Sequence, residues 1–109
     1  SALLGNYEEI HSYNRNHTEN YNHKVFSFVR WNDTEKLIII SNFDATESYE
    51  FDLKIPESII SSWKLKEGNY PFSDQLYGKN TSTLKVTKGK SSIKIKIDPL
   101  ESFILKLNH

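Results

Sequence analysis

The side chains of this 109-residue chain that could bind a metal or act as a nucleophile are few and poorly spaced. His11, His17 and His23 are six residues apart in a stretch rich in Asn. A metal site requires histidines on one face of a rigid element, as in His-x-x-x-His on a helix or His-x-His on a strand. The chain also has no cysteine, which excludes disulfides, thiolate nucleophiles and Cys-ligated metals. The sequence therefore predicts no metal site.

The carboxylates are dispersed along the chain rather than paired. Glycoside hydrolysis requires two carboxyl groups about 5–10 Å apart across a cleft. Glu50 and Asp52 are neighbours on one face of a predicted strand, but the pattern indicates that this face is solvated. The other candidates occupy predicted strand ends or turns: Asp44, Asp74, Asp98 and Glu101. The chain also lacks the nucleophile-elbow, phosphate-loop and dinucleotide motifs, so we predict no catalytic residue, no cofactor and no enzymatic activity.

Four aromatic residues gather in and just before residues 66–80, which have no regular period and are predicted to be an irregular connection: Trp63, Tyr70, Phe72 and Tyr77. Exposed rings of this kind could stack on the apolar face of a sugar, which would make them a carbohydrate-binding platform. Large aromatic side chains are more often buried, and the same rings could instead close one end of a hydrophobic core. The sequence leaves both interpretations open.

Alternating apolar and polar residues indicate strands with one buried face. Residues 48–55 and 91–98 alternate in this way, which is typical of antiparallel sheets. Residues 24–31 and 36–43 are more continuously apolar, so we predict central strands covered on both sides, joined by a hairpin loop at 32–35. A second hairpin is predicted to turn at 88–90, because Gly89 permits the left-handed backbone of a tight turn.

The remaining segments complete an all-β prediction. Residues 101–108 form a final predicted strand, and 56–65 a short turn of helix. Residues 12–23 are rich in Asn, His and Tyr without a period, which predicts an exposed loop. With about seven to eight strands and no long helical period, we expect an antiparallel β-sandwich of Greek-key type, formed by residues 1–109 as a single domain.

The charge balance excludes two classes of partner. Fourteen basic and fourteen acidic residues cancel, whereas binding to nucleic acid or to an anionic membrane requires a surplus of Lys and Arg. No apolar run approaches the ~18 residues of a transmembrane helix. We therefore expect neither nucleic acid nor membrane among the partners.

Five motifs in order carry a family resemblance: "ALLGNY" at 2–7, "VFSFVR" at 25–30, "KLIIISNF" at 36–43, "DQLYGK" at 74–79 and "PLESFILKL" at 99–107. Together they resemble the C-terminal β-sandwich, called domain C, of α-amylase family enzymes (glycoside hydrolase family 13). Two positions depart from the family pattern: Gln75 replaces a usual aliphatic residue, and Leu100 replaces a usual Tyr or Phe. The bond specificity therefore stays open between α-amylase, α-glucosidase and cyclomaltodextrinase types.

The resemblance implies a non-catalytic accessory domain, because the family's catalytic Asp and Glu residues lie on a (β/α)₈ barrel. It implies that residues 1–6 are the trailing end of that barrel and that the domain packs against the barrel and stabilises it. One flank, including parts of 1–10, should then expose apolar residues. The alternatives are a module that binds starch or maltooligosaccharides through Trp63, Tyr70, Phe72 and Tyr77, and a generic immunoglobulin-like interaction domain. The compartment stays open, with a bacterial periplasmic or extracellular location favoured over the cytoplasm.

Overall fold

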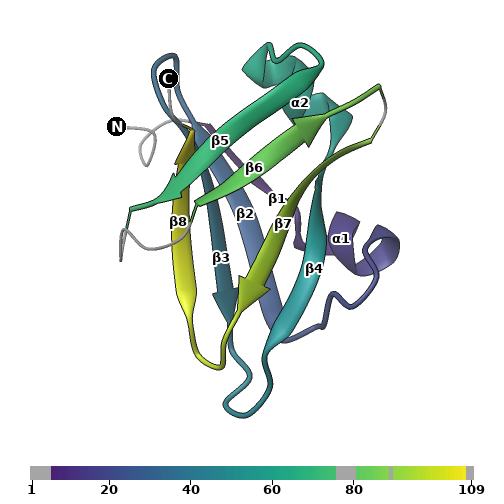
Figure 1. Ribbon diagram of the computed structural model, residues 1–109, viewed down its shortest axis with the longest axis vertical. Coiled ribbons are helices and arrows are strands. Elements are labelled where there is room, and N and C mark those ends of the chain that lie inside the picture. The colour runs from purple at the N-terminus through teal and green to yellow at the C-terminus, as the bar shows by residue number, and fades with distance from the viewer. Residues whose placement is uncertain (1–5, 76–80, 89, 108–109) are drawn as a thin grey trace.

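The computed structural model describes residues 6–75, 81–88 and 90–107. These residues form antiparallel strands and two short helices (Figure 1). In chain order the elements are β1 (Asn6–Glu9), α1 (His11–His17), β2 (Val25–Trp31), β3 (Lys36–Asn42), β4 (Tyr49–Ile55), α2 (Glu57–Trp63), β5 (Gly68–Asp74), β6 (Thr81–Val86), β7 (Ser91–Ile97) and β8 (Ser102–Leu107). No helix in the described part is long and apolar enough to cross a membrane.

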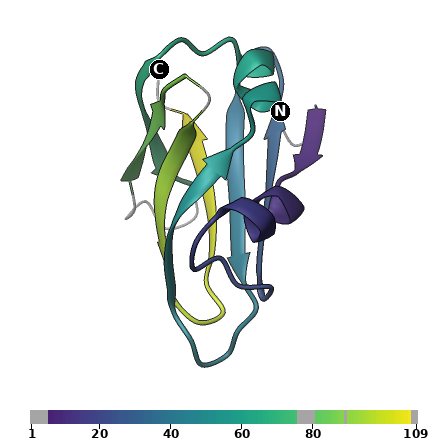
Figure 2. The same ribbon diagram turned by 90° about the vertical axis from the view of Figure 1, so that its right-hand side faces the viewer.

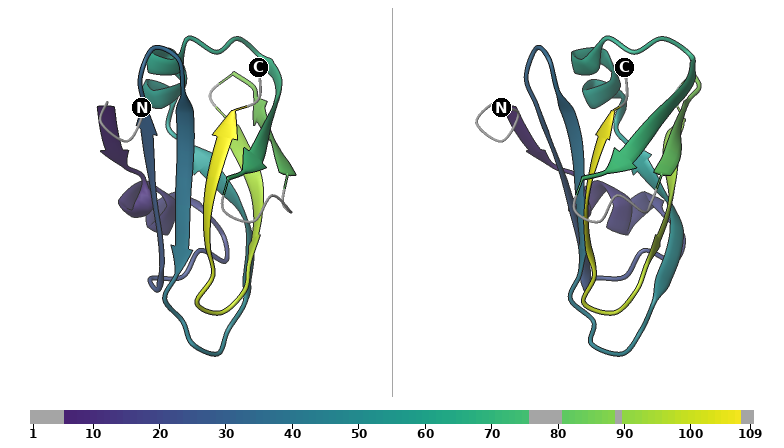
Figure 3. Two further views of the ribbon diagram at one scale, coloured as in Figure 1. Left: turned by 90° about the vertical axis from the view of Figure 1, so that its left-hand side faces the viewer. Right: turned by 60° about the vertical axis from the view of Figure 1, so that its left-hand side comes forward.

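The strands are hydrogen-bonded in the order β1-β2-β3-β8-β5-β6-β7-β4. This sheet curls over itself, so that β1, β2, β3 and β8 form one layer and β5, β6, β7 and β4 form the other (Figure 3). Strands β5, β6 and β7 follow one another, and β8 returns to lie beside β5, which is the Greek-key order. The predicted all-β antiparallel sandwich is therefore confirmed.

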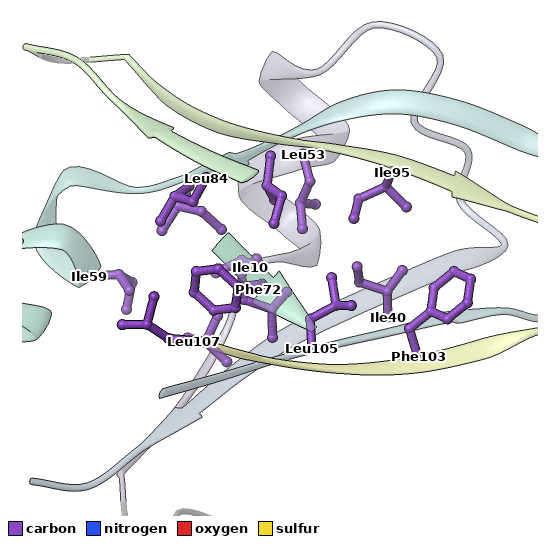
Figure 4. Close-up of a cluster of buried hydrophobic side chains, with 14 of the residues drawn as sticks. Ile10, Ile40, Leu53, Ile59, Phe72, Leu84, Ile95, Phe103, Leu105 and Leu107 are labelled. Carbon is purple, nitrogen blue, oxygen red and sulfur yellow. The ribbon is translucent and has the colours of Figure 1, made fainter. Parts of the chain in front are cut away.

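The hydrophobic core fills the space between the two layers. Figure 4 shows side chains from both layers pointing toward one another, with Phe72 between them. The largest fully buried side chains are Phe72, Ile10, Ile38, Ile40, Leu53, Ile59, Leu84, Ile93, Ile97 and Leu105. They come from both layers, from α2 and from the residue that follows β1. One core therefore joins the two layers and α2.

The alternation predicted for two strands is confirmed. In β4, Phe51, Leu53 and Ile55 are buried and the residues between them are exposed or half-buried. In β7, the three isoleucines are buried, whereas Lys94 and Lys96 are exposed. Each strand therefore places its apolar face in the core and its charged face in water.

The predicted loop at 12–23 is wrong for its first half, which forms α1. The error arises because the buried residues of this segment are polar. Asn14 is fully buried, and its side-chain amide donates to Lys54 O at 2.9 Å and accepts from Lys54 N at 2.7 Å. The amide thereby pairs with the edge of β4 as a strand would. In Figure 2, α1 lies at the open side of the sandwich, between β1 and β4.

The predicted irregular connection at 66–80 is wrong for residues 68–74, which form β5. Gly68 and Pro71 reduce the strand signal, yet Phe72 and Asp74 alternate toward the interior. The predicted short helix after Pro56 is confirmed as α2, which ends where Lys64 adopts a left-handed backbone (φ 58°). The turn glycine at position 89 lies outside the described residues, as do residues 76–80 and 1–5.

Candidate interaction surface

Two interpretations were open for the four aromatic residues Trp63, Tyr70, Phe72 and Tyr77: a sugar-binding platform, or rings that close one end of the core. Trp63 is 3% exposed and Phe72 is fully buried, with their ring centroids 6.1 Å apart inside the core. Tyr70 is half-buried, and its hydroxyl donates to Lys66 O at 2.7 Å. Tyr77 lies outside the described residues. Trp63 and Phe72 follow the second interpretation, because their rings fill the end of the core and present no face to a ligand.

The histidines and carboxylates do not converge on a reactive centre within the described ranges. No three of the His, Asp or Glu side chains described are placed to hold a metal ion. His11 accepts from or donates to the hydroxyl of Tyr21 at 3.0 Å, whereas His17 and His23 are exposed. Glu50 and Asp52 are both exposed on β4. These side chains have structural or solvated roles.

The most strongly perturbed carboxyl group belongs to Asp44, in the turn between β3 and β4. It accepts from the backbone N–H groups of Thr46 and Glu47 and from the hydroxyl of Tyr49 at 2.7 Å. These hydrogen bonds stabilise the carboxylate and hold the pKa of Asp44 well below its usual range. The hydrogen bond between Tyr49 and Asp44 also raises the pKa of Tyr49 to about 12. The cluster fixes a turn rather than an active site, because the groups that donate hydrogen bonds to the carboxylate belong to that turn or to β4, and the exposed Lys24 ammonium is 3.9 Å away.

Tyr21 is a second buried ionisable group. Its hydroxyl lies 2.8 Å from the Ser27 hydroxyl and 3.0 Å from Nδ1 of His11. Burial raises the pKa of Tyr21 to about 12, since the phenolate would lose its hydration. The hydrogen bonds connect α1 and the segment after it to β2. Tyr21 therefore anchors the residues that join these two elements.

The outward side of the layer formed by β1, β2, β3 and β8 is unusually apolar. We call it the apolar face and define it by Tyr7, Phe26, Phe28, Arg30, Leu37, Ile39, Phe43 and Ile104. Glu9, Ser41, Ser102 and Lys106 occupy the remaining outward positions of the same strands. Tyr7 and Phe43 are 49% and 67% exposed. No second layer of the described chain lies over this side of the sheet (Figure 3). A sheet face that is exposed to water in the working protein would instead carry polar residues at these positions.

The centre of the apolar face is a packed cluster of its own. Leu37 and Ile39 are only 6% and 9% exposed, because Phe28 and Ile104 on the flanking strands cover them. The continuous apolar pattern of residues 36–43 predicts a strand covered on both sides. Its inner side is covered by the second layer, but its outer side is covered only by these neighbouring side chains. The available signal was the run of four apolar residues at 37–40, where a solvated strand would alternate.

The N-terminal end of the apolar face is an ordered aromatic group. The Tyr7 and Phe28 ring centroids are 5.3 Å apart. The Arg30 guanidinium lies 4.8 Å from the Tyr7 ring and 5.7 Å from the Phe28 ring, which are cation–π distances. Long side chains held in this way lose little further entropy when a partner covers them. The geometry therefore suits the apolar face to protein contact.

Comparison with known proteins agrees with this architecture. Two solved structures of AmyP, one an E221Q variant in complex with maltotriose and one in complex with maltose, share the fold. Their TM-scores are 0.52 and 0.51, at 17% and 19% identity. The matches cover 95% and 94% of this chain, and this chain spans 16% of the length of each AmyP chain. A comparison with curated proteins finds no match.

A family model describes the chain over most of its length. The family is "Alpha amylase, C-terminal all-beta domain", and the match extends over residues 15–108. This agrees with the all-β Greek-key sandwich. The chain belongs to the family of C-terminal all-β domains of α-amylases.

Proposed function

We propose that this domain is the non-catalytic accessory part of an α-glucan-acting glycoside hydrolase, and that it packs against the catalytic (β/α)₈ barrel and stabilises it. The observation that carries the proposal is the apolar face. It is broad, extends from Tyr7 at one end to Phe43 at the other, and includes an ordered cluster around Ile39. Covering such a face stabilises a protein by about 2.5 kcal/mol per 100 Å² of apolar surface removed from water.

The barrel of the same polypeptide is the occupant that fits best. The related AmyP chains are much longer than this one, since it spans 16% of each. Strand β1 borders the apolar face, so a domain that precedes β1 in the polypeptide would lie beside this face (Figure 1). The same relatives bind maltotriose and maltose in their crystals, which supports α-glucan as the substrate class of the whole enzyme.

The test compares this chain alone with the intact protein encoded by its gene. We expect amide hydrogen exchange at Ile39 and Ile104 to slow in the intact protein, with no change at Lys94 on the opposite layer. Glu in place of Ile104 (Ile104→Glu) should lower the melting temperature of the barrel, because it introduces a charge into the interface. Lys96→Glu, on the opposite layer, is the matched control and should leave the barrel unchanged.

Two results would overturn the proposal. One is a gene that encodes no barrel together with this chain. The other is equal exchange rates at Ile39 and Ile104 in the isolated and intact forms, because a docked face must exclude water.

A further inference from the structure

A groove lies on the opposite side of the molecule from the apolar face. It is enclosed by α1, α2, strand β4 and the turn between β6 and β7, and its volume is about 830 Å³. Figure 2 shows both helices on the same side of the sandwich, with β4 beside them. The volume lies within the range of about 300–1,000 Å³ that small-molecule sites occupy. No residue that lines the groove belongs to the apolar face, so docking of a barrel on that face leaves the groove open.

The floor of the groove is apolar and rigid. Ile55, Ile60 and Val86 line it with 3%, 7% and 5% of their surface exposed, so each is anchored in the core. Leu65 adds a half-buried apolar surface, and its N–H donates to Ile60 O at 3.2 Å. The three buried residues give the groove a fixed base, and Leu65 supplies most of the apolar surface that a ligand could contact.

An exposed aromatic pair stands at one end. The rings of Tyr13 and His17 are stacked at 4.4 Å with an interplanar angle of 18°, and Tyr13 is 38% exposed. His17 Nδ1 donates to Tyr13 O at 2.8 Å, and the Lys54 ammonium donates to His17 O. These bonds hold the stacked pair in place before any ligand arrives. Preorganised rings bind with a smaller loss of entropy.

The walls carry polar groups of both signs. Four lysines line the groove together with three carboxylates, those of Asp52, Glu57 and Glu67. Ser61 and Ser92 contribute hydroxyl groups. Glu67 and Lys88 are held together, because the backbone N–H of Lys88 donates to the Glu67 carboxylate at 3.1 Å. A strongly anionic or cationic ligand would meet repulsion from one set of charges. A neutral ligand with many hydroxyl groups would find both donors and acceptors.

We propose that this groove binds a short neutral oligosaccharide. A pyranose ring has an apolar face of C–H groups and a rim of hydroxyls, which match an aromatic platform and polar walls respectively. One ring lies against Tyr13, and the hydroxyls of the next bond Ser61 and the Glu57 carboxylate. The site includes none of Trp63, Tyr70, Phe72 and Tyr77, and it uses no residue of the apolar face.

The test is an NMR titration of the 109-residue chain with maltotriose, using cellotriose and inorganic phosphate as comparison ligands. We expect saturable shifts of backbone amides at Tyr13, Ser61 and Lys88. Tyr13→Ala should weaken maltotriose binding about tenfold, since it removes the stacking contact. Tyr13→Phe should retain binding. Tyr7→Ala removes an exposed ring of the apolar face and is the matched control, which should bind as the wild type does.

Three outcomes would overturn the proposal. They are no saturable shift with either trisaccharide at tens of millimolar, shifts confined to the apolar face, and saturation by phosphate instead of sugar. The amide spectrum of each variant shows whether the fold persists. Because the titration requires no barrel, its failure leaves the proposed docking untouched, and a failure of docking leaves this result intact.

Discussion

The two outward faces of this sandwich differ in polarity: one is charged, and the other is largely apolar. On one layer, the outward residues of β4 and β7 are charged and exposed: Glu50, Asp52, Lys94 and Lys96. We call this the charged face. On the other layer, the outward residues form the apolar face, with a buried cluster at its centre. The inward residues of both layers are mostly apolar, with Ser27, Asn42, Asp74 and Ser91 as buried polar exceptions, so the two layers differ mainly on their outer sides.

The charged face is exposed to water. Glu50 pairs with Lys96 and Asp52 with Lys94 across the two strands, so opposite charges stand directly opposite one another. The apolar face pairs Phe28 with Ile39 and Ile39 with Ile104. A sheet needs one buried face to fold, and the core already provides it. The second apolar surface therefore indicates a partner rather than a requirement of the fold.

The largest expected loss of stability comes from a substitution in the core, between the two outward faces. Phe72→Ala should reduce the free energy of unfolding by about 3–5 kcal/mol, because it opens a cavity at the point where both layers meet. Urea denaturation followed by circular dichroism measures this change. A loss below about 1 kcal/mol would mean that the ring lies outside the core and would restore it as a candidate for ligand contact.

The connection between the two layers at their open side should be almost as sensitive. Asn14→Ala removes the amide that bonds both the N–H and the C=O of Lys54. Leaving these backbone groups unpaired should cost about 2–3 kcal/mol. Asn16→Ala, an exposed change on the same helix, is the control and should be nearly neutral. Hydrogen exchange at the Lys54 amide should accelerate only in the Asn14 variant, and unchanged protection there would refute this role.

Removing the centre of the apolar face should have a moderate effect on the chain alone. Ile39→Ala should reduce the free energy of unfolding by about 2 kcal/mol, from lost packing against Phe28 and Ile104 and from lower β-propensity. Urea denaturation of the isolated chain measures it. A negligible loss would mean that packing within the cluster does not stabilise the chain, and the contrast between the two faces would weaken.

Asp44, which follows Phe43 at the end of the apolar face, should make stability depend on pH. Its folded pKa lies below the unfolded value of 3.8, so its contribution is present above that pH and is lost as the pH falls below it. The Tyr49 pKa of about 12 acts oppositely, and its contribution is lost as the pH rises above 10.0. Urea midpoints between pH about 2 and 6 should fall in acid for the wild type and less steeply for Asp44→Asn.

The smallest effect is expected on the charged face. Lys94→Ala removes an exposed lysine opposite Asp52 and should change the free energy of unfolding by no more than about 0.5 kcal/mol. The same urea titration as for Ile39→Ala provides the measurement. A loss as large as that of Ile39→Ala would show that the two faces contribute equally and would remove the contrast.

The strands with period-two patterns could be predicted because their burial is encoded in adjacent residues. β4 and β7 are such cases, and so is the hairpin loop at 32–35, where Asn32 accepts from the N–H groups of Thr34 and Glu35. Segment α1 was missed because its buried residue, Asn14, is polar. Asn14 stabilises the fold through hydrogen bonds with the backbone of Lys54, forty positions away. Strand β5 was missed because Gly68 and Pro71 suggest a turn, and only pairing with β6 and β8 overrides them.

The all-β class could be predicted from the residues because it depends on local alternation, and the family resemblance because it depends on five motifs in order. Tertiary structure alone decided the direction in which each aromatic ring points. Trp63 and Phe72 face the core, whereas Tyr7 and Tyr13 face outward on opposite sides. The physical reason is that burial depends on contacts between residues distant in the chain. A sequence pattern can say that a ring has one buried side, but only the packed layers define which side that is.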